Sequence, residues 1–466
     1  MPASLALLTD LYELTMAYGY WRSGKESDEA VFHLFFRENP FDGGFAVAAG
    51  LQSVIDYLDA LHFTDDDLRY LSTIFPADFI EHLRGFRFTC DVDAIPEGTV
   101  VFAHEPLVRV TGPIAQAQII ESALLNFINF QTLIATKASR IVLAAQGDPV
   151  IDFGLRRAQG IDGAMSATRA AFIGGVAGTS NVLAGATFGI PVRGTHAHSW
   201  VMSFPNERLA FHAYAAAMPE KSLLLVDTYD TLEGVGNAIE TGRRLRERGQ
   251  ELLGIRLDSG DLATLSIQAR RMLDTAGFPA AVIAASNDLD EYEIASLKEQ
   301  GAAINMWGVG TRLITAYDQP ALGGVYKLTA IRQQGGEWQP KIKISEEWIK
   351  TSTPGVLTVR RFEIAGEAVA DMIRDVNEEP TNEMIDSLEL RRRTDSEAVA
   401  TDLLVPIYRK GQRVYDPPPL DAIRAHAAHD LAKFPAGIKR FMNPRRYPVG
   451  LELQLFDRKR DMVTNR

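Results

Sequence analysis

The residues of this chain that could do chemistry stand directly after short apolar runs. One such run ends in Phe153-Gly-Leu-Arg156, which presents an aromatic ring and, beyond a glycine, a guanidinium group. An aromatic face can stack on a flat ring, and a guanidinium can bind a carboxylate or phosphate through two parallel hydrogen bonds. The pair therefore suits a flat anionic ring, while a core phenylalanine beside a surface arginine is the alternative.

A second run ends in two histidines, His196 and His198, which lie two residues apart. If this stretch is extended, their side chains point to opposite faces, so only one of them can be directed into a shared site. A neutral imidazole can act as a nucleophile, as an acid-base group or as a metal ligand. Because the nine histidines of the chain include no His-Glu-x-x-His pattern, a zinc site is the weakest of these interpretations. A structural histidine is the other alternative.

Two later runs end in charged and glycine-rich segments. Arg256 and Asp258 alternate along one of them, which places a cation and a carboxylate on one side of a strand end. Asp261 follows at the start of the next helix, where the helix dipole explains it without a catalytic role. In the last run, Gly308-Val-Gly310-Thr311 precedes a helix, and such a segment offers backbone amides and a hydroxyl to a phosphate.

Seven apolar runs must position these residues. They begin at residues 150, 173, 190, 223, 253, 282 and 304, and helix-compatible stretches such as 261–276 and 288–300 separate most of them. Alternating strands and helices are typical of a parallel β/α architecture, whose active site lies at the carboxyl ends of the strands. We therefore predict an α/β fold with an irregular, TIM-like β/α barrel.

The chain of 466 residues is longer than one hydrophobic core usually supports. Residues 1–125 do not show the regular alternation of strands and helices. We expect them to form the N-terminal part of an α+β domain. The barrel domain is expected over residues 126–330. Residues 331–466 show alternating strands with many charges and are expected to complete the α+β domain, which would then be discontinuous.

Composition argues against several classes of protein. A net charge of −12 does not favour nucleic acid as a partner, because such a partner requires a basic surface. The single cysteine, Cys90, excludes an internal disulfide and fits a reducing cytoplasm. Residues 170–192 carry no charge but contain five glycines and a proline, so we expect buried strand and loop rather than a membrane span. No P-loop sequence occurs, so any ATP would be bound without a P-loop.

Taken together, seven motifs make the chain similar to the nicotinate phosphoribosyltransferase family. In chain order they are 9–16, 35–41, 153–156, 178–181, 194–200, 255–261 and 307–312. The resemblance implies a type II phosphoribosyltransferase fold and a homodimer whose active site is shared between subunits. It also implies an ATP-dependent ligase that joins nicotinate to phosphoribosyl diphosphate in NAD salvage, with Mg²⁺ as cofactor and without a permanent metal ligand from the chain.

The resemblance assigns roles to individual positions. His198 matches the histidine that ATP phosphorylates, giving a phosphohistidine, and Asp258 is expected to face the ribose hydroxyls as a second catalytic residue. Phe153 and Tyr12, the latter from the other subunit, match the aromatic pair that sandwiches the pyridine ring. The remaining expected contacts with nicotinate are Arg156, Ser180, Thr195 and Arg256, and those with phosphoribosyl diphosphate are Arg37, Lys137, Gly308, Gly310 and Thr311.

Three positions qualify the resemblance. Related nicotinamide enzymes carry aspartate where Ser180 stands, and an aspartate would repel the carboxylate of nicotinate, so Ser180 favours the acid. Leu357 stands where the family usually shows a lysine, and Lys341, Lys343 and Lys350 lie near it in the sequence. Asp227 lies in an acidic pair that superficially resembles a diphosphate-reading motif, but it lacks the following Thr-Gly loop and is expected to take no part.

Rival functions stay open from the sequence. Nicotinamide or quinolinate phosphoribosyl transfer is the closest alternative. The first requires that Ser180 does not set the preference, and the second would show no stimulation by ATP. A metal-dependent barrel hydrolase would use His196, His198 and Asp258. A descendant that only binds nucleotides is the third alternative, although every central motif is intact.

Overall fold

The computed structural model describes residues 4–333, 335–347, 350–386, 390–394 and 398–465. The chain divides into two compact units. Unit 1 comprises Met1–Leu133 and Ala321–Arg466, and unit 2 comprises Ile134–Pro320. The boundaries expected from the sequence, after residues 125 and 330, compare with 133 and 320 in the structure.

Unit 2 is built on a six-stranded sheet with the order β7-β6-β11-β10-β9-β8, in which the strands pair in parallel. Its strands are β6 (Val150–Asp152), β7 (Gly178–Thr179), β8 (Leu223–Leu225), β9 (Gly254–Leu257), β10 (Val282–Ala285) and β11 (Met306–Val309). These segments are short and almost wholly buried, which explains why they read as continuous apolar runs in the sequence.

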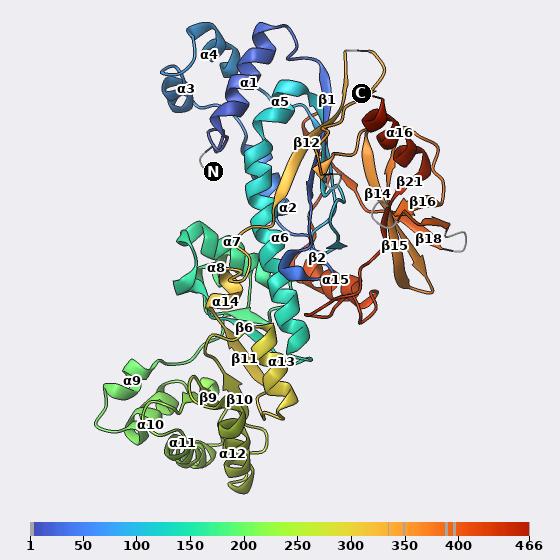
Figure 1. Ribbon diagram of the computed structural model, residues 1–466. Helices are drawn as coiled ribbons and strands as arrows, with labels where there is room; N and C mark the ends of the chain where they lie inside the picture. Colours follow the sequence, from blue (N-terminus) through green and yellow to red (C-terminus); the bar gives the residue numbers. More distant parts are fainter. Residues whose placement is uncertain (1–3, 334, 348–349, 387–389, 395–397, 466) are drawn as a thin grey trace. The chain divides into compact units, whose positions relative to one another are not determined.

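Helices follow every strand of this sheet, so the predicted alternation of strands and helices is confirmed. They are α7 (Gly160–Ile173), α8 (Val182–Phe188), α9 (His198–Met202), α10 (Glu207–Ala217), α11 (Thr231–Arg246), α12 (Leu262–Thr275), α13 (Glu291–Glu299) and α14 (Thr311–Ile314). Figure 1 shows α11 and α12 beside strands β9 and β10. Asp261 caps α12 by accepting a hydrogen bond from the backbone N–H of Thr264, 3.1 Å away, which confirms its structural role.

The third apolar run, residues 190–198, is not a regular strand. Val192 forms one parallel bridge to Thr179 at the edge of β7. Further along the same segment, the Thr195 hydroxyl donates to the carbonyl oxygen of Leu223, and the backbone N–H of Leu225 donates to His196 Nε2 over 3.3 Å. Side chains thus connect this segment to β8, while a closed ring of paired strands is not found in the described part of unit 2.

Unit 1 contains two large sheets. In the first, with the order β13-β12-β1-β5-β3-β19-β20, strand β1 (Glu29–Phe36) pairs antiparallel with both β5 (Val108–Pro113) and β12 (Gly324–Arg332). Segments from both ends of the chain therefore share one sheet. Its other strands are β3 (Asp91–Ala94), β13 (Gln339–Pro340), β19 (Val405–Arg409) and β20 (Gln412–Arg413), and a two-stranded sheet joins β2 (Ala46–Val47) to β4 (Val100–Val101).

The second large sheet has the order β17-β16-β21-β15-β14-β18. Its strands are β14 (Leu357–Ile364), β15 (Glu367–Asp375), β16 (Glu383–Asp386), β17 (Arg392–Thr394), β18 (Val399–Asp402) and β21 (Val449–Glu452). The helices are α1 (Leu11–Arg22), α2 (Leu51–Ala60), α3 (Asp65–Leu71), α4 (Ala77–Arg84), α5 (Ile114–Ile119), α15 (Leu420–Ala432) and α16 (Leu453–Thr464), and α6 (Glu121–Ala144) contains the boundary between the units.

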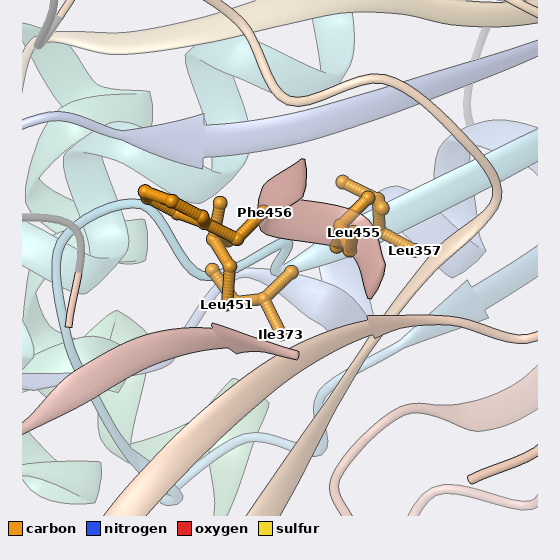
Figure 2. Packing of buried hydrophobic residues seen from close by; sticks show 5 residues of the cluster. All are labelled: Leu357, Ile373, Leu451, Leu455 and Phe456. Atoms are coloured by element: carbon orange, nitrogen blue, oxygen red, sulfur yellow. The ribbon is translucent and has the colours of Figure 1, made fainter. Parts of the chain in front are cut away.

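An apolar cluster fixes α16 on this second sheet. Leu455 and Phe456 of α16 pack on Leu357, Ile373 and Leu451 of three neighbouring strands (Figure 2). All five side chains are at least nine-tenths buried, and burial of each large apolar side chain stabilises the fold by about 1.5–3 kcal/mol. Leu357, where the family usually shows a lysine, is therefore a core residue here.

Among the described residues, no helix combines the length and the apolar character needed to cross a membrane. The uncharged stretch 170–192 comprises the end of α7, strand β7, helix α8 and the loops between them. Strand β7 and the loops agree with the prediction of buried strand and loop, whereas α8 is a helix that the prediction lacked, with Val182 and Leu183 exposed.

Candidate active site

A cavity of about 490 Å³ opens at the carboxyl ends of the unit 2 strands. We call it the strand-end cavity. It is lined by Phe153, Leu155, Arg156, Arg157, Ser180, Gly194, Thr195, His196, Ala197, His198, Arg256, Asp258, Ser286, Asn287, Asp288, Gly308, Gly310 and Thr311. Most of the site residues predicted from the sequence are thus brought together, because parallel strands place their carboxyl ends on one side of a sheet.

The Phe153 ring lies against the backbone of a neighbouring strand. A Cβ atom on Gly308 would fall 2.5 Å from Phe153 Cε2, so only glycine leaves room for the ring. On the cavity side, the guanidinium carbon of Arg256 lies 6.0 Å from the centre of the ring. The glycine that the sequence suggested for a phosphate cradle therefore also positions the aromatic side chain.

Asp152, at the end of β6, fixes the turn that carries Phe153. One carboxylate oxygen accepts from the backbone N–H of Gly154 at 2.7 Å, and the other accepts from the hydroxyls of Thr168 and Thr179 at 2.9 and 2.8 Å. Burial raises the pKa of Asp152 above its usual range, although these three hydrogen bonds act in the opposite direction. This support makes Phe153 a rigid part of the site.

His198 is the first residue of α9, and two side chains flank its ring. Its Nδ1 lies 3.1 Å from the hydroxyl oxygen of Thr228, and its Nε2 lies 3.8 Å from Asp258 Oδ2. The side chain is 39% exposed, so a ligand in the cavity can reach the ring. Thr228 was missed by the sequence analysis, although it follows β8 as the other site residues follow their strands.

His196 differs from His198 in its surroundings. Its ring is buried, packs edge-on against Tyr214 and accepts a hydrogen bond from the backbone of Leu225. Burial lowers the pKa of His196 to about 4, so it is neutral at physiological pH. His196 therefore positions the segment that leads to His198.

A small charge cluster occupies the end of β9. Arg256 lies 4.0 Å from Asp258, its side chain is 14% exposed, and its Nε is buried without a hydrogen-bond partner among the described residues. Burial lowers the pKa of Arg256, while Asp258 and Asp227 act in the opposite direction. A buried guanidinium with an unused donor beside an aromatic ring is suited to bind the carboxylate of a flat ligand.

Asp227, which is not expected to read a diphosphate, supports the end of β9. One of its oxygens accepts from the backbone N–H of Asp258 at 2.9 Å and from the hydroxyl of Ser259 at 2.6 Å. Its other oxygen, Oδ1, is buried without a hydrogen-bond partner in the described part of the chain. Asp227 therefore supports the position of Asp258.

The loops after β10 and β11 supply the polar end of the cavity. Gly310 and Thr311 line it, as predicted, together with Ser286, Asn287 and Asp288. The hydroxyl of Ser286 donates to Asp258, and Asn287 and Asp288 have left-handed backbone angles, with φ of 111° and 39°. These three residues were not identified from the sequence, although their place at the end of the sixth apolar run was a usable signal.

Lys137 does not line the strand-end cavity, and the structure corrects its predicted role. Its side chain is fully buried, and its ammonium lies 2.7 Å from Glu291 and 2.6 Å from Asp318. Two carboxylates thus surround the charge, and the contact with phosphoribosyl diphosphate that we expected is wrong for this structure. Lys137 belongs to a buried ion network that also includes Arg140.

Tyr12 and Arg37 belong to unit 1, outside the unit that forms the strand-end cavity. Tyr12 lies on α1 with 45% of its surface exposed, and burial together with nearby carboxylates raises its pKa. Arg37 lines a different cavity within unit 1. Their predicted contacts with the substrates stay predictions.

No cluster of three or more His, Cys, Asp or Glu side chains that could hold a metal ion occurs among the described residues. His196, whose Nε2 accepts from a backbone N–H, and His198 do not form the ligand pair that a metal-dependent hydrolase would need. The site instead combines an aromatic ring, buried arginine and a histidine flanked by a hydroxyl and a carboxylate.

Comparisons with known proteins support the family resemblance of the sequence. The family model for the nicotinate phosphoribosyltransferase N-terminal domain matches residues 7–129, the family's central model matches 149–377, and the model for its C-terminal domain matches 357–459. The chain is 45% identical to a nicotinate phosphoribosyltransferase of Bacillus subtilis over 99% of this chain and 95% of that protein.

Two solved structures show the same fold. The crystal structure of human nicotinic acid phosphoribosyltransferase matches with a TM-score of 0.85 and 32% identity, and the match covers 97% of this chain and 99% of that one. The nicotinate-nucleotide pyrophosphorylase of Pyrococcus furiosus matches with a TM-score of 0.71 over 92% and 96% of the two chains. At 22% identity, the second match shows a shared fold alone.

Proposed function

The chain belongs to the nicotinate phosphoribosyltransferase family, whose members act in NAD biosynthesis, and from this premise we propose that it transfers phosphoribosyl from phosphoribosyl diphosphate to nicotinate with ATP coupling through His198. The products are nicotinate mononucleotide and diphosphate. One observation carries the proposal: the Phe153 ring, the buried Arg256 and the flanked His198 line the same strand-end cavity.

Nicotinate binds in this proposal with its pyridine ring on the face of Phe153. Its carboxylate accepts from Arg256, whose buried Nε has no other hydrogen-bond partner in the described chain, and contacts with Arg156, Ser180 and Thr195 complete the nicotinate site. Ser180 carries no charge, so it does not oppose the carboxylate as an aspartate would. Offset stacking and a charge-assisted pair together orient the ring nitrogen toward the sugar.

The transfer step forms a bond between the pyridine nitrogen and the anomeric carbon and breaks the bond from that carbon to the diphosphate oxygen. The electron pair of the broken bond leaves with diphosphate. Such a step needs alignment of two substrates and stabilisation of charge more than a protein nucleophile. Asp258, held by Ser286 and by the Asp227 carboxylate, faces the ribose, and Gly308, Gly310 and Thr311 receive the 5-phosphate.

His198 takes the γ-phosphoryl group of ATP in the coupled step. Because Thr228 lies at Nδ1, we assign the reaction to Nε2, the nitrogen on the Asp258 side. Nε2 attacks the γ-phosphorus, the bond from that phosphorus to the bridging oxygen breaks, and ADP leaves. Water later cleaves the phosphorus–nitrogen bond and releases phosphate.

The donor set of the cavity fits Mg²⁺, which prefers one or two carboxylates combined with substrate phosphates. Asp258 would hold the ion together with the diphosphate oxygens, and the buried, unpartnered Oδ1 of Asp227 adds a second oxygen close by. When bound, the ion neutralises charge on the leaving diphosphate.

Three features of the family complete the proposal. Residues 190–198 close the sheet of unit 2 into an irregular barrel, because they bond to β7 on one side and to β8 on the other. Two copies of the chain form a homodimer in which Tyr12 and Arg37 reach the partner's site. The enzyme works in the cytoplasm, in keeping with its single, buried cysteine.

The test incubates purified protein with phosphoribosyl diphosphate, Mg²⁺ and nicotinate, nicotinamide or quinolinate, each with and without ATP. We expect nicotinate mononucleotide from nicotinate, formed faster with ATP. Product from nicotinamide or quinolinate instead would move the chain to another substrate class. A hydrolytic activity that ignores phosphoribosyl diphosphate and is lost on chelation would support the hydrolase alternative.

A second measurement tests the phosphohistidine. His198→Ala is expected to keep slow product formation but to lose all ATP hydrolysis coupled to it. Thr228→Val, which removes the partner of Nδ1, should reduce phosphorylation of His198 by about 2–10-fold, the worth of one hydrogen bond. If His198→Ala hydrolysed ATP at the wild-type ratio to product, the assignment would be wrong.

A further inference from the structure

A second cavity, of about 410 Å³, lies within unit 1. We call it the basic cavity. Its lining residues come from six separate parts of the chain and are Arg37, Glu38, Asn39, Asp42, Gly43, Phe102, Ala103, His104, Thr353, Ile373, Arg446, Tyr447, Val449, Gly450, Leu451 and Lys459. None of them lines the strand-end cavity, and the proposed chemistry uses only Arg37.

Four basic side chains converge on this cavity: Arg37, His104, Arg446 and Lys459. Burial, together with the positive charges of Lys459, Arg37 and Arg446, lowers the pKa of His104 to about 4. All three cations therefore act on the same imidazole. Arg446 also pairs with Asp386 at 2.8 Å, and Glu38 and Asp42 line the cavity, but the charges that act on the imidazole are positive, so an anionic ligand would meet complementary charge there.

Lys459 is built into the wall of the cavity. It follows Leu455 and Phe456 by four and three residues on α16, so it shares their face of the helix. Those two side chains are anchored in the apolar cluster of Figure 2, which fixes the helix on its sheet. Lys459 itself is 6% exposed, and its ammonium donates to the hydroxyl of Thr353 at 3.2 Å.

The backbone around the cavity is held in uncommon conformations. His104, Phe41 and Asp42 have left-handed angles, with φ of 71°, 60° and 47°. The N–H of His104 donates to the carbonyl oxygen of Phe36 at 2.7 Å, which maintains the turn at the cavity wall. Non-glycine residues in such conformations cost about 1–3 kcal/mol each and concentrate at ligand sites.

The rest of the wall is largely apolar. Phe102 and Tyr447 stack with ring centres 4.1 Å apart, and Ile373, Val449 and Leu451 extend the apolar surface. A bare inorganic ion would leave this surface in contact with water. A ligand that matches both parts carries a phosphate and a flat, less polar group, and a cavity of this volume accommodates a molecule of that size.

We propose that the basic cavity binds a nucleotide, with the phosphate among Arg37, His104, Arg446 and Lys459 and the base along the apolar wall. The site uses residues of the C-terminal segment, for which the sequence suggested no role. The proposal goes beyond the transfer reaction and does not depend on which pyridine base the strand-end cavity accepts.

Calorimetric titration of the full-length protein with adenosine 5′-monophosphate tests this site, with adenosine and inorganic phosphate titrated separately. We expect the monophosphate to bind at least about 10-fold more tightly than either fragment, because only it satisfies both parts of the cavity. Lys459→Met should weaken its binding at least about 10-fold, since a buried cation that contacts a phosphate is lost.

Two further variants keep the result interpretable. Arg460→Met removes a charge from the same helix at a position that is 53% exposed and does not line the cavity, so it should bind as the wild type does. Arg446→Gln removes a more exposed cation of the cavity and should weaken binding by a smaller factor. Circular dichroism establishes that each variant is folded.

Several outcomes overturn the proposal. Binding of the monophosphate that is unchanged in Lys459→Met would place it elsewhere, and no binding to wild type would reject the site. If phosphate alone bound as tightly as the monophosphate, the nucleotide assignment would be wrong. Nicotinate mononucleotide formation, assayed on the same preparations, is a separate readout, so its failure would leave the Lys459-dependent binding standing.

Discussion

The two cavities of this protein are assembled in opposite ways. In the strand-end cavity, consecutive strands each contribute the residues that follow them, and the buried Arg256 lies among the carboxylates of Asp258 and Asp227. In the basic cavity, six separate parts of the chain contribute, and the cations of Arg37 and Lys459 act on the imidazole of His104. In a repeating fold, the site residues follow successive strands and can therefore be recognised in the sequence. A site built by tertiary packing can be recognised only in the structure.

The same contrast appears in two buried lysines. Lys137 in unit 2 is neutralised by Glu291 and Asp318, and it lines neither cavity described here. Lys459 in unit 1 lines the basic cavity, and burial lowers its pKa to about 8. A buried lysine between carboxylates serves the fold, while one directed into a cavity is available to a ligand at a cost in stability.

The largest expected effect, on stability, comes from removing the ammonium group of Lys137 from its ion pairs. Lys137→Met leaves the buried carboxylate of Glu291 and the partly exposed carboxylate of Asp318 without this cation. It should lower the free energy of unfolding by about 3–5 kcal/mol, measured by urea denaturation. The KM for phosphoribosyl diphosphate should not change. Lys350→Met is the control, because its pair with Glu347 is about half exposed and should contribute no more than about 1 kcal/mol. A raised KM for phosphoribosyl diphosphate with unchanged stability would show that Lys137 contacts this substrate after all.

Arg256→Leu should impair catalysis at the strand-end cavity, with a free-energy effect nearly as large. Loss of a buried, charge-assisted contact costs about 3–4 kcal/mol, so kcat/KM for nicotinate should fall about 10²–10³-fold. The rate with nicotinamide, which lacks the carboxylate, should fall far less. Arg244→Leu on α11 removes an exposed arginine and should leave both rates unchanged. An equal loss of activity with nicotinate and with nicotinamide would show that Arg256 does not bind the carboxylate.

The two cavities also differ in how far their residues could be predicted from the sequence. The strands of unit 2 are buried on both faces, so their apolar runs and the polar residues after them, from Phe153 to Thr311, stood out in the sequence. Thr228 and Ser286 follow the same rule and could have been found by it. The position of Lys137 in an ion network could not, because Glu291 and Asp318 lie more than 150 residues away in the chain. The basic cavity was invisible for the same reason.

Lys459→Met tests the second of the two buried lysines, the one that lines the basic cavity. The folded-state pKa of about 8 lies below the ordinary 10.5, so folding disfavours the charged form, and the cost is fully present below pH 8. This difference corresponds to about 3 kcal/mol. The variant should therefore be more stable than wild type at pH 7, and the gain should fade as the pH rises from 8 toward 10.5. Arg37, His104 and Arg446 line the cavity with this lysine.

Urea denaturation at pH 7 and pH 10 measures the effect, with Arg460→Met as the control on the same helix. A Lys459→Met protein that was less stable than wild type at pH 7 would show that the lysine supports the fold. It would then resemble Lys137, and the distinction between the two lysines would be lost.

Gly308→Ala carries the smallest expected effect and tests how rigidly the strand-end cavity is built. The new methyl group would lie 2.5 Å from the Phe153 ring, so the ring must move, and a shift of this kind should lower kcat/KM for nicotinate about 10-fold. Gly236→Ala in α11, where nothing lies within 4 Å, should instead stabilise the protein by about 0.5–1 kcal/mol without a change in rate. In a Phe153→Leu background, Gly308→Ala should cost little, because the ring with which it clashes is absent. Equal losses in both backgrounds would mean that Gly308 acts on the phosphate directly rather than through Phe153.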